Sequence, residues 1–437
     1  MPDSIHRSII VQSNKQPHLR HNFAVNVMDG TFFGFGMYAA SYQTVLPLFF
    51  ATLTDSALLI GLIGSIHFLG WQLPQMFTVG HVARLRRYKR FVLMMTIQER
   101  IPYIGLLLIA LASPHISREL ALVAAFLMVM WQGLGSGLTA TGWQSMIAKI
   151  MPDDMRGRFY GAQSSMAQGM GVGGALLAGF LLERLDSPWD YAACFAVAAL
   201  GMAISFGFLA QTRESEHEVE QPDRIGFLDV LRSARTILKR DANFRWFTIV
   251  RILAQVAMVA QSFFAIFALR RFGIQEDVIA GVMTTVLLVA QALSNPLLGW
   301  LGDRFGHRYA VIIGVVAAIC SALFALFATG AGSFYFAFAL SGVASGALWT
   351  TVLAMTAEFG TPAERPYYIG LSNTLVAPAT LLIPVFTGWL VEQAGFASAF
   401  AFAAFGGVLA LIVAYLRLRD PVPRQRGKIL SAPAVGD

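Results

Sequence analysis

Residues 299–308 read GWLGDRFGHR, a short stretch rich in glycine and cations between two long apolar runs. The runs on either side, residues 280–298 and 309–328, are each long enough to cross a bilayer as a helix. Two membrane-length helices joined by so short a loop must be antiparallel neighbours. The glycines allow the tight turn because they have no Cβ to clash with the backbone. The stretch therefore predicts a helical membrane protein.

The charged residues of this loop indicate the side of the membrane that it faces. Asp303 lies where one helix is expected to end and the next to begin. Arg304 and Arg308 are expected to stay in water on the cytoplasmic side, where loops carry an excess of Lys and Arg. The connections on the opposite side hold Arg118, Arg184, Arg270 and Arg271. We therefore expect both termini in the cytoplasm and the protein in the cell membrane.

The composition supports an integral membrane protein. The chain has 437 residues, of which 56% are hydrophobic and only 13% are charged, whereas soluble domains carry about 25% charged residues. The net charge of +7 does not indicate a nucleic-acid partner, because the cations lie between apolar runs and do not form a basic face. Cys194 and Cys320 are isolated in apolar segments, so neither a disulfide nor a metal site is expected.

Hydropathy predicts twelve membrane helices in two sets of six. The first set is expected at residues 23–51, 56–80, 90–112, 119–148, 158–182 and 189–211. The second set is expected at residues 244–270, 277–298, 309–329, 333–358, 367–391 and 397–418. The resulting domains are a cytoplasmic tail (1–22), an N-terminal bundle (23–211), a linker (212–243), a C-terminal bundle (244–418) and a second cytoplasmic tail (419–437).

Within the linker, apolar residues recur at helical spacing among basic residues from 225 to 240. This pattern predicts an amphipathic helix on the inner membrane surface. The two sets of helices also repeat some residues. Asn22 opens the first predicted helix as Asn243 opens the seventh, and Pro74 precedes the first basic loop as Pro296 precedes the second. The repeat indicates two halves of similar design.

The loop at 299–308 resembles the signature of the major facilitator superfamily, Gly-x-x-x-Asp-Arg-x-Gly-Arg-Arg. The matching residues are Gly299, Asp303, Arg304, Gly306 and Arg308. His307 stands where the family usually has an arginine. The resemblance implies an all-α fold of twelve transmembrane helices in two pseudo-symmetric halves, which transports by alternating access. It also implies that the loop controls a hinge on the cytoplasmic face.

Departures from the family leave the mechanism open. Gln132 and Gly133 match a pattern of proton-coupled drug exporters, but Val129 occupies the position of their arginine. The basic loop at residues 80–90 lacks the aspartate that the family has there. The resemblance therefore implies a transporter without identifying its coupling ion.

Two ionisable residues near the cytoplasmic ends of predicted spans are functional candidates, because charges within a membrane are costly. Asp29 lies on a polar face of the first helix, and Arg251 lies 222 residues later, close to the repeat-related position of the seventh helix. One hypothesis is that the two pair as a gate latch, or that Asp29 is a proton site. The alternative is that each is satisfied within its own half.

Glu99 and Arg100 form a third charged site, in the third predicted helix. Adjacent residues on a helix point about 100° apart, so we expect them not to pair well with each other. Each is then expected to find a partner on another helix. Because the third helix is peripheral in the family, a structural polar cluster is favoured over a substrate contact.

The resemblance implies that the first, fourth, seventh and tenth helices line a central cavity. Side chains on these helices that could orient a substrate are Asn26, Phe33, Gln43, Gln132, Thr139, Trp143, Gln255, Ser262, Ser345 and Trp349. The alternative for the small polar residues is hydrogen bonding between helices. His67, in the second helix, is expected to be a buried packing residue.

The function expected from these observations is secondary transport of a small organic solute, since the first and seventh helices are rich in aromatic residues. Export is favoured over import, and protons are left open as the coupling partner. The sequence contains no catalytic cluster or nucleotide-binding motif in a suitable context, so no enzyme activity and no cofactor are expected. We expect a monomer in the lipid bilayer. The alternative function is a membrane-embedded lipid-handling or sensor protein on the same scaffold.

Overall fold

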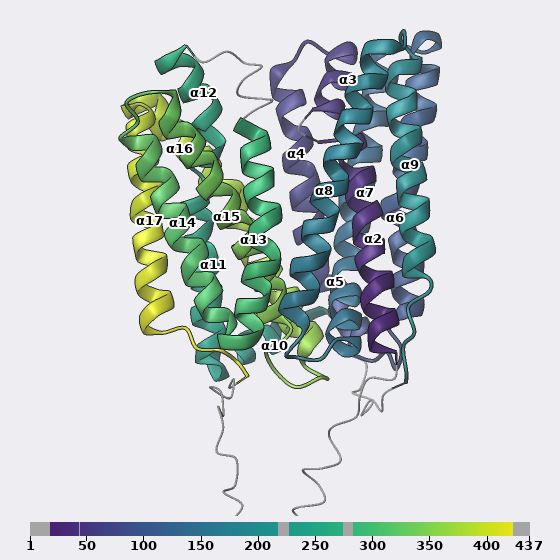
Figure 1. Cartoon of the computed structure of the whole chain (residues 1–437). Helices are drawn as coiled ribbons and strands as arrows, with labels where there is room; N and C mark the ends of the chain where they lie inside the picture. Colours follow the sequence, from purple (N-terminus) through teal and green to yellow (C-terminus); the bar gives the residue numbers. More distant parts are fainter. Residues whose placement is uncertain (1–17, 43, 217–226, 274–282, 423–437) are drawn as a thin grey trace, which may run out of the picture. The chain divides into compact units, whose positions relative to one another are not determined.

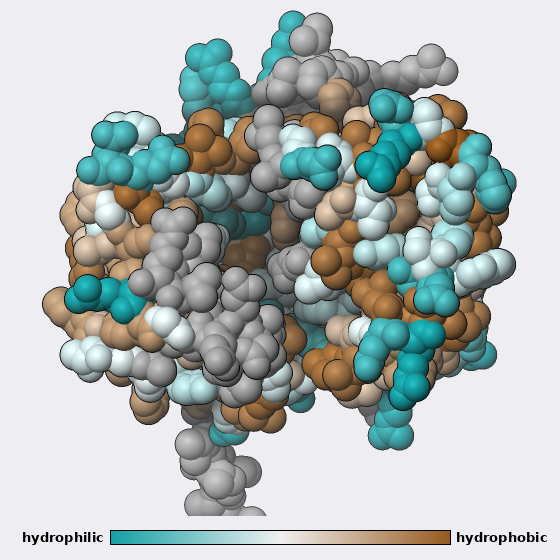
Figure 2. Space-filling model, turned by 90° about the horizontal axis from the view of Figure 1, so that it is seen from above, coloured by the Kyte–Doolittle hydropathy of each residue, from teal (hydrophilic) through white to brown (hydrophobic). Residues whose placement is uncertain are grey.

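The computed structural model describes residues 18–42, 44–216, 227–273 and 283–422, and every regular element in these ranges is a helix. Ten of the described helices are long and apolar enough to cross a membrane, and they correspond to ten of the twelve predicted spans. In a bilayer the backbone polar groups must be satisfied within the segment, which helices achieve. Apolar side chains lie on the outward sides of the molecule in the end-on view of Figure 2, among polar residues at the helix ends.

The chain divides into two compact units. Unit 1 comprises Met1–Phe159, Met166–Val230 and Pro362–Thr374. Its helices are α2 (Leu19–Ala39), α3 (Val45–Leu53), α4 (Ala57–Gln72), α5 (Gln75–Val82), α6 (Lys89–Ala112), the short η1 (Ser113–His115), α7 (Arg118–Ile150), most of α8 (Arg156–Arg184) and α9 (Trp189–Leu209). Helix α6 packs against α7 and α9, and α9 packs against α2 (Figure 1).

Unit 2 comprises Tyr160–Ser165, Leu231–Thr361 and Leu375–Asp437. Its helices are most of α10 (Phe227–Arg240), α11 (Ala242–Met258), α12 (Gln261–Phe272), α13 (Thr284–Phe305), α14 (His307–Leu326), α15 (Ala331–Thr356), most of α16 (Arg365–Ala394) and α17 (Phe396–Leu416). Helix α15 packs against α13 and α14, and α17 packs against α11 and α14. The domain boundaries expected from the sequence stay predictions.

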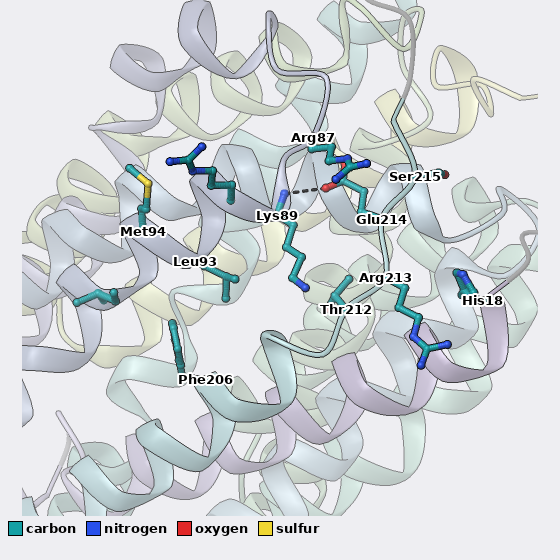
Figure 3. Close-up of a pocket in the computed structure, with 12 residues that line it drawn as sticks. His18, Arg87, Lys89, Leu93, Met94, Phe206, Thr212, Arg213, Glu214 and Ser215 are labelled. Atoms are coloured by element: carbon teal, nitrogen blue, oxygen red, sulfur yellow. Dashed lines mark hydrogen bonds between the residues drawn. The ribbon is translucent and has the colours of Figure 1, made fainter.

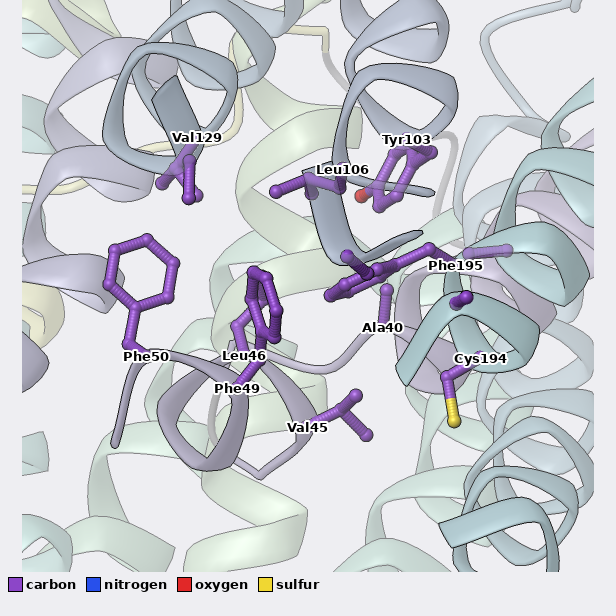
Figure 4. Packing of buried hydrophobic residues seen from close by; sticks show 14 of the residues in the cluster. Ala40, Val45, Leu46, Phe49, Phe50, Tyr103, Leu106, Val129, Cys194 and Phe195 are labelled. Atoms are coloured by element: carbon purple, nitrogen blue, oxygen red, sulfur yellow. The ribbon is translucent and has the colours of Figure 1, made fainter. Parts of the chain in front are cut away.

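Aromatic side chains fill the core of unit 1 where α3 meets α9. The Phe49 ring meets the Phe195 ring edge to face, with centroids 5.3 Å apart (Figure 4). The ring centroids of Phe50 and Phe126 lie 4.7 Å apart. Phe264 and Phe400 lie at the centre of a similar cluster in unit 2, with ring centroids 5.8 Å apart. Because lipid is as apolar as these side chains, close packing rather than expulsion of water is what holds such helices together.

Prolines break two of the predicted spans. The span expected at 23–51 is divided into α2 and α3, and Pro47 lies in the first turn of α3, where its missing N–H leaves no hydrogen bond unmade. The span expected at 56–80 is divided into α4 and α5 just before Pro74. A proline clashes with the carbonyl four residues earlier, so a continuous helix is disfavoured at both places.

The span expected at 244–270 is also divided, into α11 and α12, although no proline marks the site. At the break, the amide of Ser262 donates to the carbonyl of Val259 (3.1 Å), and the amide of Phe263 donates to the carbonyl of Ala260 (3.0 Å). These bonds reach three residues back instead of four, so the chain tightens into a short 3₁₀ turn. The break places Gln261 where its Oε1 accepts a hydrogen bond from Ser341 (2.7 Å).

The amphipathic helix expected at 225–240 is confirmed in its described part by α10. Ala234 and Ile237 are buried, whereas Arg235 and Lys239 are exposed. The helix therefore has one apolar and one basic face. Its location on the membrane surface stays a prediction.

The repeated asparagines have the same role in the two units. The Asn22 side chain donates to the carbonyl of Arg213 and accepts from its amide, both at 2.8 Å. The Asn243 side chain makes the same pair of bonds with Arg419, at 2.8 and 2.9 Å. Arg213 follows α9 and Arg419 follows α17, so each asparagine joins the start of the first helix of its half to the chain beyond the last.

We predict that Asn22→Ala lowers the thermal stability of the purified protein in detergent more than Asn243→Ala does. Asn22 is buried and its bonds to Arg213 are partly shielded from water, so losing them costs about 1–3 kcal/mol. Asn243 lies nearer the surface, where water replaces the lost bonds. Equal unfolding temperatures for the two variants would contradict this role for Asn22.

Candidate functional site

Asp29 lies on α2 and its carboxylate is held by two other helices. The side chain is 5% exposed. The Ser205 hydroxyl, on α9, donates to its Oδ1 at 2.6 Å. The Nη2 of Arg100, on α6, lies 3.4 Å from the same oxygen. A buried carboxylate in a membrane protein needs such partners, because an unpaired charge there is costly.

Arg100 is the centre of this cluster. Its Nη2 also donates to the Ser205 hydroxyl (2.9 Å), and its Nε donates to the carbonyl of Met202 (3.2 Å). Its Nη1 donates to the hydroxyl and the carbonyl of Thr96 on its own helix. The guanidinium carbon lies 5.5 Å from the centre of the Phe33 ring, which indicates a cation–π contact. One side chain therefore links α2, α6 and α9.

Glu99 pairs with its neighbour Arg100, contrary to the expectation from helix geometry. Its Oε1 lies 2.9 Å from Nη1 of Arg100 and accepts a hydrogen bond from the Thr96 hydroxyl at 2.5 Å. The expectation for Glu99 was wrong because the long arginine side chain folds back over its own helix. It was right for Arg100, whose other partners lie on α2 and α9.

The charges of this cluster do not balance. We call Asp29, Thr96, Glu99, Arg100 and Ser205 the Asp29 cluster. It contains two carboxylates and one guanidinium, so it carries one excess negative charge when both acids are ionised. A buried charge that lacks a partner costs several kcal/mol. The cluster is therefore chemically suited to take up one proton.

The pairing of Asp29 with Arg251 stays a prediction, because the two residues belong to different units. Within unit 1, Asp29 has the partners described above. Within unit 2, the guanidinium carbon of Arg251 lies 5.9 Å from the centre of the Phe247 ring, on the same helix α11.

A second polar cluster in unit 1 joins α4 and α7 to the break after α2. The Oε1 of Gln132 accepts hydrogen bonds from the Tyr42 hydroxyl (2.6 Å) and from Nδ1 of His67 (2.7 Å). The rings of Tyr42 and His67 stack, with centroids 4.1 Å apart. His67 therefore has a specific polar partner in addition to the packing role expected for it. We call these three residues the Gln132 cluster.

The amide nitrogen of Gln132 has no hydrogen-bond partner among the residues that the structure describes. The side chain is 1% exposed, and its oxygen is already engaged twice. An unpaired buried N–H₂ group costs about 1–3 kcal/mol. A ligand with a hydrogen-bond acceptor would recover that free energy, whereas the stacked rings offer it an aromatic surface.

Several other predicted cavity residues are occupied by structural bonds. Asn26 donates to the carbonyl of Asn22 (2.8 Å) and to the Thr212 hydroxyl (3.1 Å) at one end of α2. Thr139 donates to the carbonyl four residues earlier in α7 (2.9 Å). Trp143, further along the same helix, is half-buried. Gln43 lies outside the described residues.

The predicted cavity residues of unit 2 are not brought into one cluster. Gln255 is half-buried on α11, and Ser262 is exposed on α12. Ser345 lies 3.4 Å from Oε1 of Gln261. Trp349 is exposed. Among these four residues of unit 2, none has an unpaired buried group comparable to the amide of Gln132.

The signature residues lie at the end of α13 and the start of α14, and both Asp303 and His307 are buried. The prediction of a loop over 299–308 was wrong, because α13 continues to Phe305 and α14 begins at His307. The chain turns at Gly306 alone, whose positive φ of +114° allows so tight a connection.

Nε2 of His307 lies 3.3 Å from Oε1 of Glu358 and 3.8 Å from Oδ1 of Asp303, close enough for ion pairs though not aligned as hydrogen bonds. Gly302 allows this packing, because a Cβ there would lie 2.2 Å from Nδ1 of His307. The histidine that replaces the family's arginine therefore lies between two acids.

The two arginines of the loop differ in their surroundings. Arg304 is exposed, as expected, and lies 5.4 Å from the centre of the Trp300 ring. Arg308 is half-buried rather than free in water, because its guanidinium donates to the carbonyls of Ala414 and Tyr415 at the end of α17. A cation is favourable at that position, since the C-terminus of a helix carries partial negative charge. Gly299 is buried in the last turns of α13.

The sequence comparisons connect the chain to known transporters. The family model of the Major Facilitator Superfamily matches residues 30–279 and 267–434. The tetracenomycin C resistance and export protein of Streptomyces glaucescens is 29% identical over 181 residues, which are 40% of this chain and 33% of that protein. The vesicular acetylcholine transporter of Mus musculus is 31% identical over 144 residues, which are 32% of this chain and 27% of that protein. The chain thus spans about a third or less of the length of these relatives.

Solved structures share the fold over nearly the whole chain. The human organic anion transporter MFSD10 has a TM-score of 0.73 at 14% identity, covering 91% of this chain and 100% of that chain. The proton:xylose symporter XylE has a TM-score of 0.73 at 18% identity, covering 92% of this chain and 96% of that chain. The likeness confirms the predicted all-α membrane fold.

We predict that Gly306→Ala lowers the unfolding temperature of the detergent-purified protein by several degrees. Gly306 has a φ of +114°, a conformation that costs about 1–3 kcal/mol for other residues. A Cβ would also lie 2.1 Å from the Asp420 carboxylate, which accepts a hydrogen bond from the amide of Arg308. Gly332→Ala is the control, because that position has open space and an ordinary φ. A loss as large for Gly332→Ala would refute the argument.

Proposed function

Because the chain belongs to the major facilitator superfamily, we propose that it is a secondary transporter that moves a small organic solute across the cell membrane by alternating access. Two groups of relatives, an export protein and vesicular transporters, support movement of the solute out of the cytoplasm. The distribution of Lys and Arg supports cytoplasmic termini. The chain acts as a monomeric carrier, with no covalent chemistry.

The observation that carries the proposal is the excess carboxylate of the Asp29 cluster. When Asp29 is ionised, its attraction to Arg100 ties α2 to α6 and α9. A proton on Asp29 removes that attraction and leaves Arg100 paired with Glu99 alone. Proton binding thereby weakens the hold on α2, a helix that lines the solute path in this family. We infer that the proton gradient drives transport through this cluster.

The Gln132 cluster supplies the contact to the solute. Its orphan amide donates to an acceptor atom such as a carbonyl, ether or carboxylate oxygen. Its stacked Tyr42 and His67 rings contact the apolar or aromatic body of the same molecule. The substrate class that fits is an amphipathic organic molecule with at least one acceptor.

We predict that Asp29→Asn abolishes solute uptake driven by a pH gradient in inverted vesicles or liposomes but leaves solute exchange without a gradient within about twofold. The substitution removes the titrating acid and keeps the shape and hydrogen-bond capacity of the side chain. A panel of labelled organic solutes that begins with tetracenomycin C and acetylcholine supplies the readout.

Glu119→Gln is the control for this experiment, because Glu119 is an exposed acid in the first turn of α7. If the Asp29→Asn variant still shows gradient-driven uptake, Asp29 is not the coupling site. The protein would then be a facilitator or would use another ion. The alternative function, a lipid-handling or sensor protein on the same scaffold, predicts no solute flux with any member of the panel.

We predict that Gln132→Met raises the KM for transport about tenfold, with a smaller effect on the maximal rate. Methionine preserves the length of the side chain and removes the amide donor, which is worth about 1–3 kcal/mol when buried, together with the oxygen that is bonded to Tyr42 and His67. Thr139→Val is the matched control on the same helix, since the Thr139 hydroxyl is already bonded to its own backbone. A KM that rises equally in both variants would contradict a direct role for Gln132.

A further inference from the structure

A cavity of about 820 Å³ lies in unit 1, where α6 begins and the chain leaves α9. Figure 3 shows its walls, with Lys89 and Leu93 from α6 on one side and Phe206, Thr212 and Arg213 from α9 and the following segment on the other. The cavity is distinct from both the Asp29 cluster and the Gln132 cluster. We call it the basic pocket.

The basic pocket is lined by several cations. Lys89, Arg90 and Arg213 line it, and their side chains form no ion pair with any described residue. Arg87, on the rim, pairs with Glu216 at 3.2 Å, but both side chains are more than half exposed, so the pair is weak. These three cations have no ion-pair partner in the described part of the chain, so the pocket favours an anion.

The acid in the pocket wall does not neutralise these cations. The Glu214 carboxylate accepts hydrogen bonds from the backbone amides of Tyr88 (3.0 Å) and Lys89 (2.7 Å) at the start of α6. It also pairs with Nζ of Lys149 at 2.6 Å, and its side chain is 2% exposed. Its charge is therefore used to cap the helix, a structural role that leaves the pocket positive.

The other wall of the pocket is apolar and continues along the membrane-facing side of α6. Leu93, Met94, Ile97 and Phe206 line the cavity. Beyond it, large apolar side chains recur every three or four residues on the same face. Those exposed by 39–60% are Met94, Ile97, Ile101, Ile104 and Leu108. At about 1.5 Å per residue this stripe runs for roughly 20 Å, which is enough to contact an acyl chain across one leaflet of a hydrocarbon core about 30 Å thick.

We propose that the basic pocket binds an anionic phospholipid. The phosphodiester lies among Lys89, Arg90 and Arg213, and one acyl chain lies along the apolar stripe of α6. The combination of cations at the end of a span and exposed apolar residues below them matches the two parts of such a lipid and no water-soluble anion. The cations lie at the end of α6 expected in the cytoplasm, where the leaflet is rich in anionic lipid.

The test measures lipid binding to the full-length detergent-purified protein by native mass spectrometry. The probes are dioleoylphosphatidylglycerol and dioleoylphosphatidylcholine, which share their acyl chains and differ in net charge. We expect one phosphatidylglycerol to be retained at least about tenfold more strongly than phosphatidylcholine, since each phosphate-facing cation contributes about 1 kcal/mol. Equal retention of the two lipids overturns the proposal.

Two double variants locate the site. Arg90→Gln with Arg213→Gln removes two exposed cations of the pocket, and we expect the preference for phosphatidylglycerol to fall by at least about tenfold. Arg118→Gln with Arg271→Gln removes two exposed cations elsewhere, and we expect it to retain the preference. The single variant Arg90→Gln replaces the pocket double variant if the latter does not fold. Unchanged binding in the folded pocket variants, or equal losses in both double variants, refutes this site.

Two further probes separate a lipid from a free anion. Inorganic phosphate at millimolar concentration is expected not to displace the bound phosphatidylglycerol, because it makes no contact with the apolar stripe. Met94→Glu introduces a negative charge where the acyl chain begins, at a position 52% exposed. We expect it to weaken the lipid without unfolding the protein. Displacement by phosphate together with full binding to Met94→Glu would identify a free-anion site and overturn the lipid assignment.

Discussion

The guanidinium of Arg100 is the interaction on which unit 1 depends. It is 8% exposed and reaches Asp29 on α2, Ser205 and Met202 on α9, and Thr96 and Glu99 on its own helix. Loss of one partner from such a buried set leaves a charge that water cannot reach, at a cost of about 3–5 kcal/mol. The same dependence makes the cluster sensitive to protonation. One proton on Asp29 leaves Arg100 paired with Glu99 and weakens the contact between α2 and the other two helices.

The membrane imposes a second constraint, since lipid satisfies no polar group. Where the helices are regular, the backbone satisfies its own polar groups. Where they break, polar side chains gather. The break after α2 places Tyr42 against Gln132, and the break between α11 and α12 places Gln261 against Ser341. Irregular backbone and polar chemistry therefore coincide in both units.

Much of the fold was predictable because membrane helices leave a strong signal. The length of the apolar runs located the spans. The repeat of Asn22 and Asn243 corresponds to two equivalent pairs of hydrogen bonds, with Arg213 and with Arg419. Asp29 was found because a charge in a span is rare. Its partner Ser205 was not, since one hydroxyl in an apolar helix follows no pattern. The pairing of Glu99 with Arg100 was missed because helix geometry describes Cβ directions and not the reach of a long side chain. The orphan amide of Gln132 could be recognised only once its two donors were in place.

We propose that the Asp29 cluster takes up one proton, because it has two carboxylates and only one guanidinium. Infrared difference spectroscopy of the protein in lipid, recorded as the pH is raised, measures this most directly, because a protonated carboxyl has a carbonyl stretch that a carboxylate lacks. The account predicts one such band, which disappears with rising pH and is absent from the variant that combines Asp29→Asn with Glu99→Gln. A spectrum with no titrating carboxyl band, or a band that persists in that variant, would contradict it.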